Sequence, residues 1–428
     1  MPDRKRLSIS ILILVTLFLA TYFILRAWKG VHLLQSSPSK ENFLRTIRLI
    51  PSSPDPYYRM SLFHEWEMKS IDPEESLRFL KEAIERNPFE QRYWLDLAQV
   101  LHLKGERKGS GQALEKAVSV FPTGYRGRWV SGTLLLQQGS LDKAFPHFAY
   151  ILSHYPNRSR LVYEISSRVI DDRDLLIERL VPRDASSINR YIGYLCEIGD
   201  HELAKKAWQK KVSYGFKSSR EETIRYIELL IGKGKLNEGF EVWKETLREE
   251  GLKIPSDGNL ITNGGFEQDK LLGGGFDWKI GKAKGAEISF DSSVALEGKR
   301  SLKIAFGGKE NVNFHHVYQY VTLRPETEYL LKTFVKSDKI TTRSGVKIEM
   351  IGIGPRLYST SEPVTGSNEW RELTLTFKTP AGSQGGLVRV RREETEKLDR
   401  FIAGTVWIDG FQLREKTEQS KRDDDRSS

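Results

Sequence analysis

Residues able to perform catalysis do not fall into a recognisable motif in this sequence, and its cysteine and histidine residues form no metal-binding motif. The single cysteine, Cys196, can form neither an internal disulfide nor a CxxC metal or redox site. Five histidines show neither the HExxH pattern nor a paired spacing typical of metal ligands: His64, His102, His147, His154 and His201. Glycoside hydrolysis needs two carboxyl groups about 5–9 Å apart, and the acids at Glu349, Glu362 and 393–396 form no known motif. The sequence therefore favours a non-enzymatic protein.

Aromatic side chains recur at every second position of residues 314–320. Alternate side chains of a strand point to opposite faces, so one face would carry Phe314, His316, Tyr318 and Tyr320, and the other Val317, Gln319, Val321 and Leu323. A sandwich strand buries one face in the core, and we expect this to be the aliphatic face. A soluble domain seldom exposes a row of aromatic residues unless the row binds something. The inverse assignment, with the aromatic residues in the core, is the alternative.

This strand belongs to a region of β-type sequence that begins after Leu252. The linker 253–259 contains turn-forming Pro255, Asp257 and Gly258. Beyond it, short alternating segments are separated by Gly, Asp and Asn, at 301–306, 317–323, 328–336, 346–351, 372–379, 386–391 and 405–413. About eight strands in residues 258–415 predict an all-β, two-sheet jelly-roll sandwich. The polar segment 416–428 reads as a disordered tail.

A repeat of 34 residues organises the region before the sandwich. Pro88, Pro122 and Pro156 are 34 residues apart, and Gly105 recurs as Gly139. This period, with small residues inside the helices and a closing proline, resembles the tetratricopeptide repeat. We expect an all-α superhelix over residues 41–252, with three copies over about 57–156.

Later copies are expected to be more diverged. Gly199 and Gly234 suggest two further repeats, whereas 171–182 is short and breaks register. Stacked helix pairs form an extended concave face that commonly binds proteins, so the resemblance implies a protein partner there. Four tryptophans are expected to fill the space between helices: Trp94, Trp129, Trp208 and Trp243.

The N-terminal segment 1–30 has the composition of a membrane anchor. Residues 7–25 form an uncharged, mostly apolar run about 28 Å long as a helix, close to the ~30 Å hydrocarbon core. Arg4, Lys5 and Arg6 precede the run and favour a cytoplasmic N-terminus. We expect a single-pass protein of the bacterial inner membrane, with its soluble domains in the periplasm or outside. A cleaved signal peptide is the alternative, although bulky Tyr22 and Phe23 follow the only small candidate, Ala20.

The motifs of the β region resemble a carbohydrate-binding module of the cellulose-binding family 4/9, a galactose-binding-like jelly roll. The resemblance covers 259–413 and rests on NLITNGGFE at 259–267, the GGFDW segment ending at Trp278, the EGKRSLKI strand, the YQYVTLRPETEYLLKTFVKS pair, WRELTLTFKTP from Trp370, and the closing VWIDGFQL. It implies a glycan ligand, a polysaccharide or oligosaccharide, without specifying which one.

Two sites follow from that resemblance. Members of the family commonly hold one structural Ca²⁺, and Glu267 and Asp409 occupy the matching motif positions, with oxygen ligands that suit this ion. Alternatively, Asp409 caps a turn and Glu267 is solvated. The second site is a sugar face made by the four aromatic residues of 314–320, because flat rings stack on pyranose rings. Arg389 and Arg391 would supply hydrogen-bond donors from a neighbouring strand.

The charge distribution and the predicted domains limit the classes of function that this protein can have. The net charge of +10 is spread along the chain without a basic stripe, so nucleic-acid binding is not expected. We expect a membrane-anchored, non-enzymatic adaptor that binds a protein and a glycan, in bacterial cell-surface polysaccharide assembly or export. The alternatives are a purely protein-binding envelope scaffold and a jelly-roll polysaccharide lyase or hydrolase.

Overall fold

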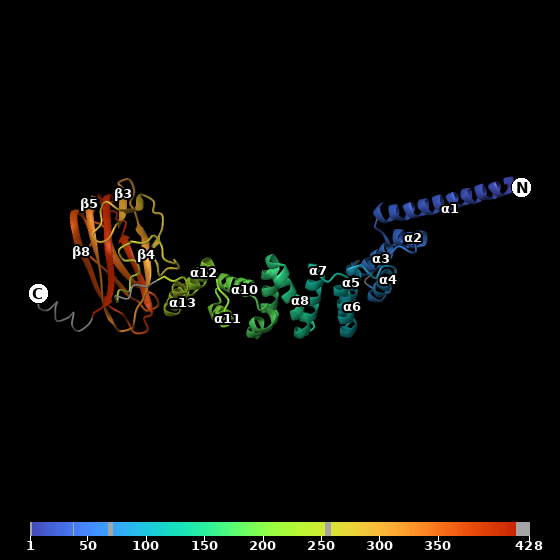
Figure 1. Cartoon of the computed structure of the whole chain (residues 1–428), viewed down its shortest axis with the longest axis horizontal. Coiled ribbons are helices and arrows are strands. Elements are labelled where there is room, and N and C mark those ends of the chain that lie inside the picture. Colours follow the sequence, from blue (N-terminus) through green and yellow to red (C-terminus); the bar gives the residue numbers. More distant parts are fainter. Residues whose placement is uncertain (1, 37, 67–71, 253–257, 417–428) are drawn as a thin grey trace. The chain divides into compact units, whose positions relative to one another are not determined.

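A computed structural model describes residues 2–36, 38–66, 72–252 and 258–416 of the chain (Figure 1). The described residues form helices up to Glu249 and strands from Lys279 onward, so the change of sequence character after Leu252 marks the change of fold. They separate into two compact units, residues 1–183 and 184–428. The last helices thus share a unit with the β-sandwich. Beyond Lys416, the tail predicted to be disordered lies outside the described residues.

The first unit is helical throughout its described part. Its helices are α1 (Pro2–Ser36), α2 (Lys40–Leu49), α3 (Asp55–Trp66), α4 (Pro73–Arg86), α5 (Gln91–Leu103), α6 (Arg107–Val120), α7 (Tyr125–Gln137), α8 (Leu141–His154) and α9 (Ser159–Val169). A 3-10 turn, η1 (Pro156–Arg158), precedes α9, and a π-helical turn, η2 (Leu176–Leu180), follows it. The π-helical turn lies in the stretch where the repeat pattern loses register.

Helix α1 contains the apolar N-terminal run. From Leu7 to Ser36 it is long and apolar enough to cross a membrane, and its apolar window has a mean hydropathy of 2.5 with no part buried. Length and composition of this kind fit both a membrane anchor and a signal sequence. The side chains of residues 2–6, on which the expected orientation depends, lie outside the described part of the chain.

The helices from α3 to α8 form three antiparallel hairpins with tetratricopeptide-like geometry (Figure 1). Small residues at the repeated positions, Ala83 and Ala117, are 0% exposed, which lets the paired helices approach closely. Gly105 and Gly139 end the first helices of two hairpins with φ of 80° and 74°, a left-handed conformation that favours glycine. The predicted repeat fold is confirmed.

The second unit begins with two more hairpins, made by α10 (Ala185–Ile198), α11 (His201–Ser213), α12 (Arg220–Gly232) and α13 (Leu236–Glu249). Gly199 and Gly234 turn the chain between their helices with φ of 71° and 73°. Trp243 is fully buried, as expected of a packing residue, whereas the other three tryptophans are half-buried.

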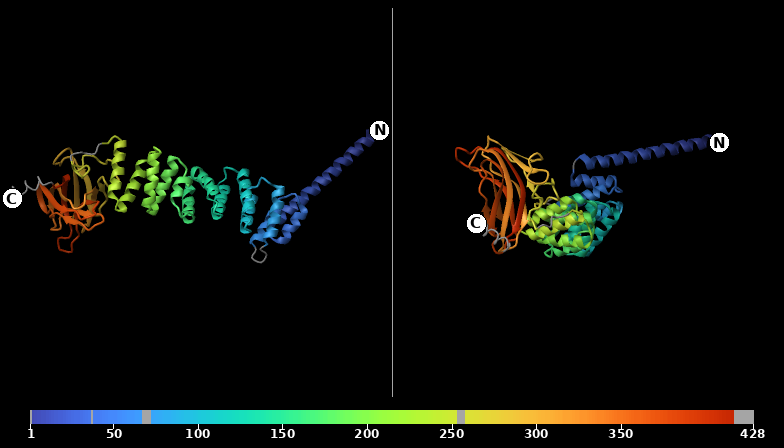
Figure 2. Two further views of the ribbon diagram at one scale, coloured as in Figure 1. Left: turned by 90° about the horizontal axis from the view of Figure 1, so that it is seen from below. Right: turned by 60° about the vertical axis from the view of Figure 1, so that its left-hand side comes forward.

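The rest of this unit is the predicted two-sheet sandwich, whose layers are visible in the further views of Figure 2. Its strands are β1 (Lys279–Ile280), β2 (Ala286–Asp291), β3 (Ser301–Gly307), β4 (Phe314–Thr322), β5 (Glu328–Ile340), β6 (Lys347–Gly352), β7 (Tyr358–Thr360), β8 (Gly366–Lys378), β9 (Gly385–Arg392) and β10 (Ala403–Glu415). One antiparallel sheet has the order β1-β4-β9-β6-β7 and the other β2-β3-β10-β5-β8.

Alternating apolar residues from both sheets fill the core between them. Val317 and Val321 on β4 are buried, and so are Val388 and Val390 on β9. Gln319 lies among them and is satisfied by Thr262, whose N–H donates to Gln319 Oε1 over 2.8 Å and whose carbonyl accepts from Nε2 over 2.9 Å. This pair fixes the opening segment of the domain against β4.

Candidate functional site

The outer face of β4 carries three of the four aromatic side chains predicted there. His316, Tyr318 and Tyr320 alternate with the buried residues of β4 and are half-buried on the outer face. Phe314 is a correction, because it is 0% exposed and packs in the core against Phe306 at 5.8 Å between ring centroids. The pairing of β4 with β9 shifts register between positions 314 and 317. The extra residue of this irregularity reverses the side-chain alternation.

A buried carboxylate forms the centre of this face. Arg389 on β9 lies opposite Tyr318 on β4, and Glu349 on β6 lies opposite Arg389. Arg389 Nε donates to Glu349 Oε2 over 2.7 Å, and the hydroxyl of Tyr358 on β7 donates to Glu349 Oε1 over 2.7 Å. Glu349 is 0% exposed, whereas Tyr358 is 54% exposed. The carboxylate therefore orients a guanidinium and a phenol toward the surface.

The other residues of the face have more structural roles. Arg391 Nη1 donates to Asn313 Oδ1 and to the Phe314 and Arg392 carbonyls, which holds the irregular start of β4. Arg391 Nε is buried without a hydrogen-bond partner and lies 3.9 Å from Glu349 Oε1. Burial, and then the neighbouring imidazole of His315, lower the pKa of His316. His316 is therefore a neutral ring at pH 7.

The hairpin α12–α13 packs against the end of this face where Tyr320 lies. One apolar cluster joins the two folds, and its buried members are Ile227, Ile231, Trp243 and Leu247 from the helices with Leu271, Leu272 and Phe276 from the sandwich. Tyr320 packs against the cluster, and its N–H donates to the Gly275 carbonyl over 2.8 Å. Burial raises the pKa of the Tyr320 phenol.

Polar contacts reinforce this junction. Trp243 Nε1 donates to the Gly273 carbonyl over 2.8 Å in a buried position. Lys279 on β1 pairs with Glu228 on α12 over 2.6 Å. The helical repeat thus forms one end of the face. Tyr320 packs against this wall, whereas Tyr318 is not part of the junction cluster. Nothing in the sequence pattern alone relates these positions, which are separated by about thirty to ninety residues.

Asp409 and Glu267, the expected metal ligands, do lie close together. A Cβ built on Gly265 would lie 3.6 Å from Asp409 Oδ1 and 3.8 Å from Glu267 Cγ. Asp409 is 0% exposed, and its Oδ2 accepts from the N–H groups of Leu296 and Glu297 over 2.9 and 3.2 Å. Burial, with a smaller contribution from Glu267, raises the pKa of Asp409 despite these donors.

Asp409 Oδ1 also accepts from the Gly410 N–H over 2.8 Å, so both its oxygens accept backbone hydrogen bonds, as in the alternative in which Asp409 caps a turn and exposed Glu267 is solvated. Glu267 Oε1 accepts from the Lys299 N–H over 2.9 Å, while its second oxygen has no partner among the described residues. Within the described part of the chain, no group of three or more His, Cys, Asp or Glu side chains could hold a metal. A cation here would thus need backbone carbonyl oxygens or water in addition, as Ca²⁺ commonly does.

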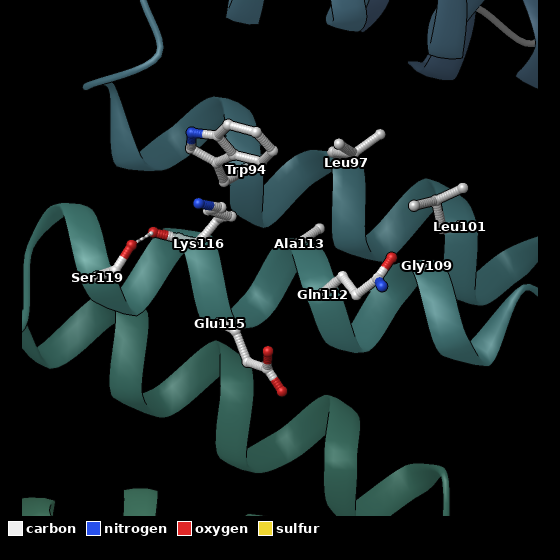
Figure 3. Close-up of a pocket in the computed structure, with 9 residues that line it drawn as sticks. All are labelled: Trp94, Leu97, Leu101, Gly109, Gln112, Ala113, Glu115, Lys116 and Ser119. Atoms are coloured by element: carbon white, nitrogen blue, oxygen red, sulfur yellow. Dashed lines mark hydrogen bonds between the residues drawn. The ribbon is translucent and has the colours of Figure 1, made fainter.

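The helical array has a surface groove of its own, between α5 and α6 (Figure 3). Its volume is about 600 Å³, and its lining residues are Trp94, Leu97, Leu101, Gly109, Gln112, Ala113, Glu115, Lys116 and Ser119. Trp94 is held at its edge by a hydrogen bond from Nε1 to the Pro88 carbonyl over 2.8 Å. Arg128 makes the equivalent bond to Pro122 one repeat later, over 3.1 Å.

Comparison with known families is informative for the β region. Residues 258–396 match a family model described as a carbohydrate binding domain. The sandwich is thus similar to the domains of that family over these residues. This match confirms the resemblance over 258–396, which includes the opening motif but ends before the closing VWIDGFQL. It includes Tyr318, Glu349 and Arg389 of the outer face, but not the helices α12 and α13. Carbohydrate-binding domains and tetratricopeptide arrays are non-catalytic kinds of fold.

Similar proteins cover only parts of the chain. A stretch of 170 residues is 28% identical to the "tRNA(Glu)-specific nuclease WapA" of Bacillus subtilis subsp. natto, and covers 38% of this chain but 7% of that protein. A solved structure described as "CBM4 structure and function" is 16% identical, with a TM-score of 0.26, over 36% of this chain and 99% of that one. YrrB, described as a TPR protein with an unusual peptide-binding site, is 13% identical, with a TM-score of 0.25, over 50% of this chain and 94% of that one. Such low scores say nothing of function.

Proposed function

We propose that this protein is a membrane-anchored, non-enzymatic adaptor that binds a polysaccharide or oligosaccharide on its sandwich and a protein on its helical array. Its role would lie in bacterial cell-surface polysaccharide assembly or export. The observation that carries the proposal is the outer face of the sandwich. There, the half-buried ring of Tyr318 lies opposite Arg389 on the next strand, and Glu349 holds Arg389 and, on its other side, the Tyr358 hydroxyl.

Each part of this face has a property that sugar binding requires. A pyranose ring would stack on Tyr318 through its C–H groups, while Arg389 and the Tyr358 hydroxyl would contact its hydroxyl groups. Because the Arg389–Glu349 pair is already formed, little side-chain entropy is lost on binding. The α12–α13 hairpin would limit the ligand at the Tyr320 end.

The protein partner is assigned to the first helices of the repeats. Arg92, Arg126 and Arg160 occupy the same repeat position, 34 residues apart on α5, α7 and α9, and all are exposed. Arg92 pairs with Glu90 over 3.0 Å and Arg160 with Glu164 over 2.9 Å, whereas Arg126 has no carboxylate within ion-pair distance among the described residues. A row of arginine residues of this kind favours a partner with an acidic segment.

Calcium and the anchor complete the proposal. Glu267 and Asp409 would hold one structural Ca²⁺ near the junction of the opening and closing segments, where the ion would neutralise two neighbouring carboxylates.

Helix α1 would remain in the inner membrane, uncleaved, with the soluble domains in the periplasm. Intact mass of protein extracted from membranes tests the anchor: retention of residues 1–30 supports it, and a mature form starting near residue 21–30 contradicts it.

An enzymatic role has less support. Both oxygens of Glu349, the one carboxylate at the centre of the face, accept hydrogen bonds from Arg389 and Tyr358. It is therefore poorly placed to act as a general acid or a nucleophile. The nuclease activity in the name of the matched Bacillus protein belongs to a chain of which only a small fraction is shared.

A glycan array probed with the full-length protein in detergent tests the proposed function. We expect binding to a restricted set of glycans, and loss of that binding in the Tyr318→Ala variant. The matched control is Trp370→Ala, which removes a half-buried aromatic residue from β8 in the other sheet. Absence of binding to every glycan, with the fold intact, would favour the purely protein-binding scaffold.

A further inference from the structure

The apolar helix α1 does not end where its membrane-spanning composition ends, but continues into the helical array. Pro54 lies 34 residues before Pro88, so residues 21–54 occupy the place of one more repeat. The last turns of α1 form its first helix and α2 its second. A Cβ on Gly30 would lie 3.1 Å from the Ile50 side chain, and Leu34 and Phe43 are buried where the two helices meet. The first repeat is thus built on the apolar helix itself.

This construction fixes the depth of the first repeat relative to a membrane. The apolar run ends at Leu25, and Gly30 follows five residues later, about 8 Å along the helix. The headgroup layer on each side of a bilayer is roughly 5–8 Å thick. The contact between α1 and α2 therefore lies at the level of the lipid headgroups. Trp28, which is 65% exposed in this interval, is a residue type enriched at that level.

The surface at this level is strongly basic. Four cationic residues, Arg26, Lys29, Lys40 and Arg48, have no carboxylate within ion-pair distance among the described residues, while Arg45 pairs with Glu41 over 2.6 Å. Between positions 26 and 48 there are thus five basic residues and one acid. The Arg26 guanidinium donates to the Arg48 carbonyl over 2.7 Å, which holds it between the two helices.

Two concavities flank Arg26 at the same level. One, of about 440 Å³, is lined by Tyr22, Leu25, Arg26, Lys29 and Leu49. The other, of about 370 Å³, is lined by Phe23, Arg26, Ala27, Leu49, Ile50, Pro51 and Ser52. Both offer apolar side chains on the side of the hydrocarbon run and a cation at their rim. This combination suits an amphiphile with an anionic head.

We propose that Arg26 and Lys29 bind the phosphate headgroup of an anionic phospholipid, whose acyl chains lie against Tyr22 and Leu25. Exposed Arg48, whose carbonyl accepts from Arg26, adds positive charge nearby. This inference rests on the proposed membrane anchoring of α1. The bound lipid would hold the first repeat against the membrane surface. Both the basic residues of this repeat and helix α1 itself would then orient the helical array relative to the membrane.

Lipid binding can be measured by native mass spectrometry of the full-length protein in detergent, with added phosphatidylglycerol or phosphatidylcholine of the same acyl chains. We expect a preference of about a hundredfold for the anionic lipid, since each of three basic residues near a surface contributes about fivefold. The triple variant Arg26→Gln, Lys29→Gln, Arg48→Gln should reduce the preference to about twofold. Excess inorganic phosphate should not displace the lipid, because it lacks acyl chains.

A matched control removes three exposed cations elsewhere in the same unit: Arg107→Gln, Lys108→Gln and Lys143→Gln. It should keep the full preference. Should the triple variant lose helical structure, the single change Lys29→Gln, at an exposed side chain, must still lower the preference. Equal lipid selectivity in the triple variant and the control would overturn the inference while leaving the anchor intact. Recovery of a chain without residues 1–30 would overturn the anchor, and the lipid site with it.

Discussion

The junction between α13 and the sandwich should behave as one cooperative contact. Trp243 on α13 and Phe276 in the sandwich are both buried, with ring centroids 6.2 Å apart. Trp243→Phe removes the hydrogen bond to the Gly273 carbonyl, and Phe276→Leu removes ring contacts with Trp243 and Phe240. Each change should cost about 1–3 kcal/mol of unfolding free energy.

The coupling between the two changes is the informative quantity. An aromatic pair in contact contributes about 0.5–1.5 kcal/mol beyond its buried area, so the double variant should be less destabilised than the sum by about that amount. Urea unfolding of a protein spanning residues 184–416, followed by circular dichroism, provides the four free energies. The control cycle pairs Trp243→Phe with Phe306→Leu, a core residue of the sandwich outside the junction cluster.

The control cycle should be additive within about 0.5 kcal/mol. Additivity of the Trp243 and Phe276 changes as well would show that the hairpin does not pack on the sandwich. A fragment of the sandwich alone would then be as stable as one that includes the hairpin. If the junction exists, the sandwich alone exposes Leu271, Leu272 and Phe276 and is less stable.

Three further outcomes follow from single positions. Phe314→Ala should cost about 3–5 kcal/mol of stability as a buried aromatic truncation, whereas Tyr318→Ala should leave the melting temperature nearly unchanged; similar melting of both would contradict the assigned faces. If a Ca²⁺ ion is bound, chelation should lower the melting temperature of the wild type and not of Asp409→Ala; identical curves with calcium and chelator reject the site. Burial lowers the pKa of Lys211 from 10.5 to about 8, an effect that Glu222 and Glu249 partly offset, so between these pH values the unfolded chain binds more protons and stability rises with pH. Lys211→Met should be more stable than wild type at pH 7, with the difference shrinking between pH 8 and 10.5; a constant difference would contradict the buried amine.

Periodicity predicted most of the fold. The 34-residue spacing of prolines and the left-handed glycines specify the helical hairpins, because both features mark helix ends regardless of context. Alternation likewise identified most strands of the sandwich. The first repeat is not apparent from the sequence, although Pro54 has the same spacing, because the apolar composition of residues 7–25 indicates a membrane anchor or signal peptide more strongly.

The face of the sandwich was less predictable, for two physical reasons. Alternation along 314–320 cannot reveal an irregular pairing with β9, and this irregularity placed Phe314 in the core. The contact of Glu349 with Arg389 joins strands about forty residues apart, so neither residue indicates the other in the sequence. A signal was nevertheless present, since Lys347 and Glu349 alternate with buried Ile348 on β6.

Titration calorimetry with the glycan selected on the array tests sugar binding by this face most directly. The full-length wild type, Tyr318→Ala and Trp370→Ala would be compared at one temperature and salt concentration. Loss of ring stacking should weaken binding in Tyr318→Ala by about 1–2 kcal/mol, by analogy with base–aromatic stacking, or about 5- to 30-fold in Kd. Trp370→Ala should bind as the wild type does. Unchanged affinity in Tyr318→Ala, with normal folding, would contradict the assignment of the glycan to this face.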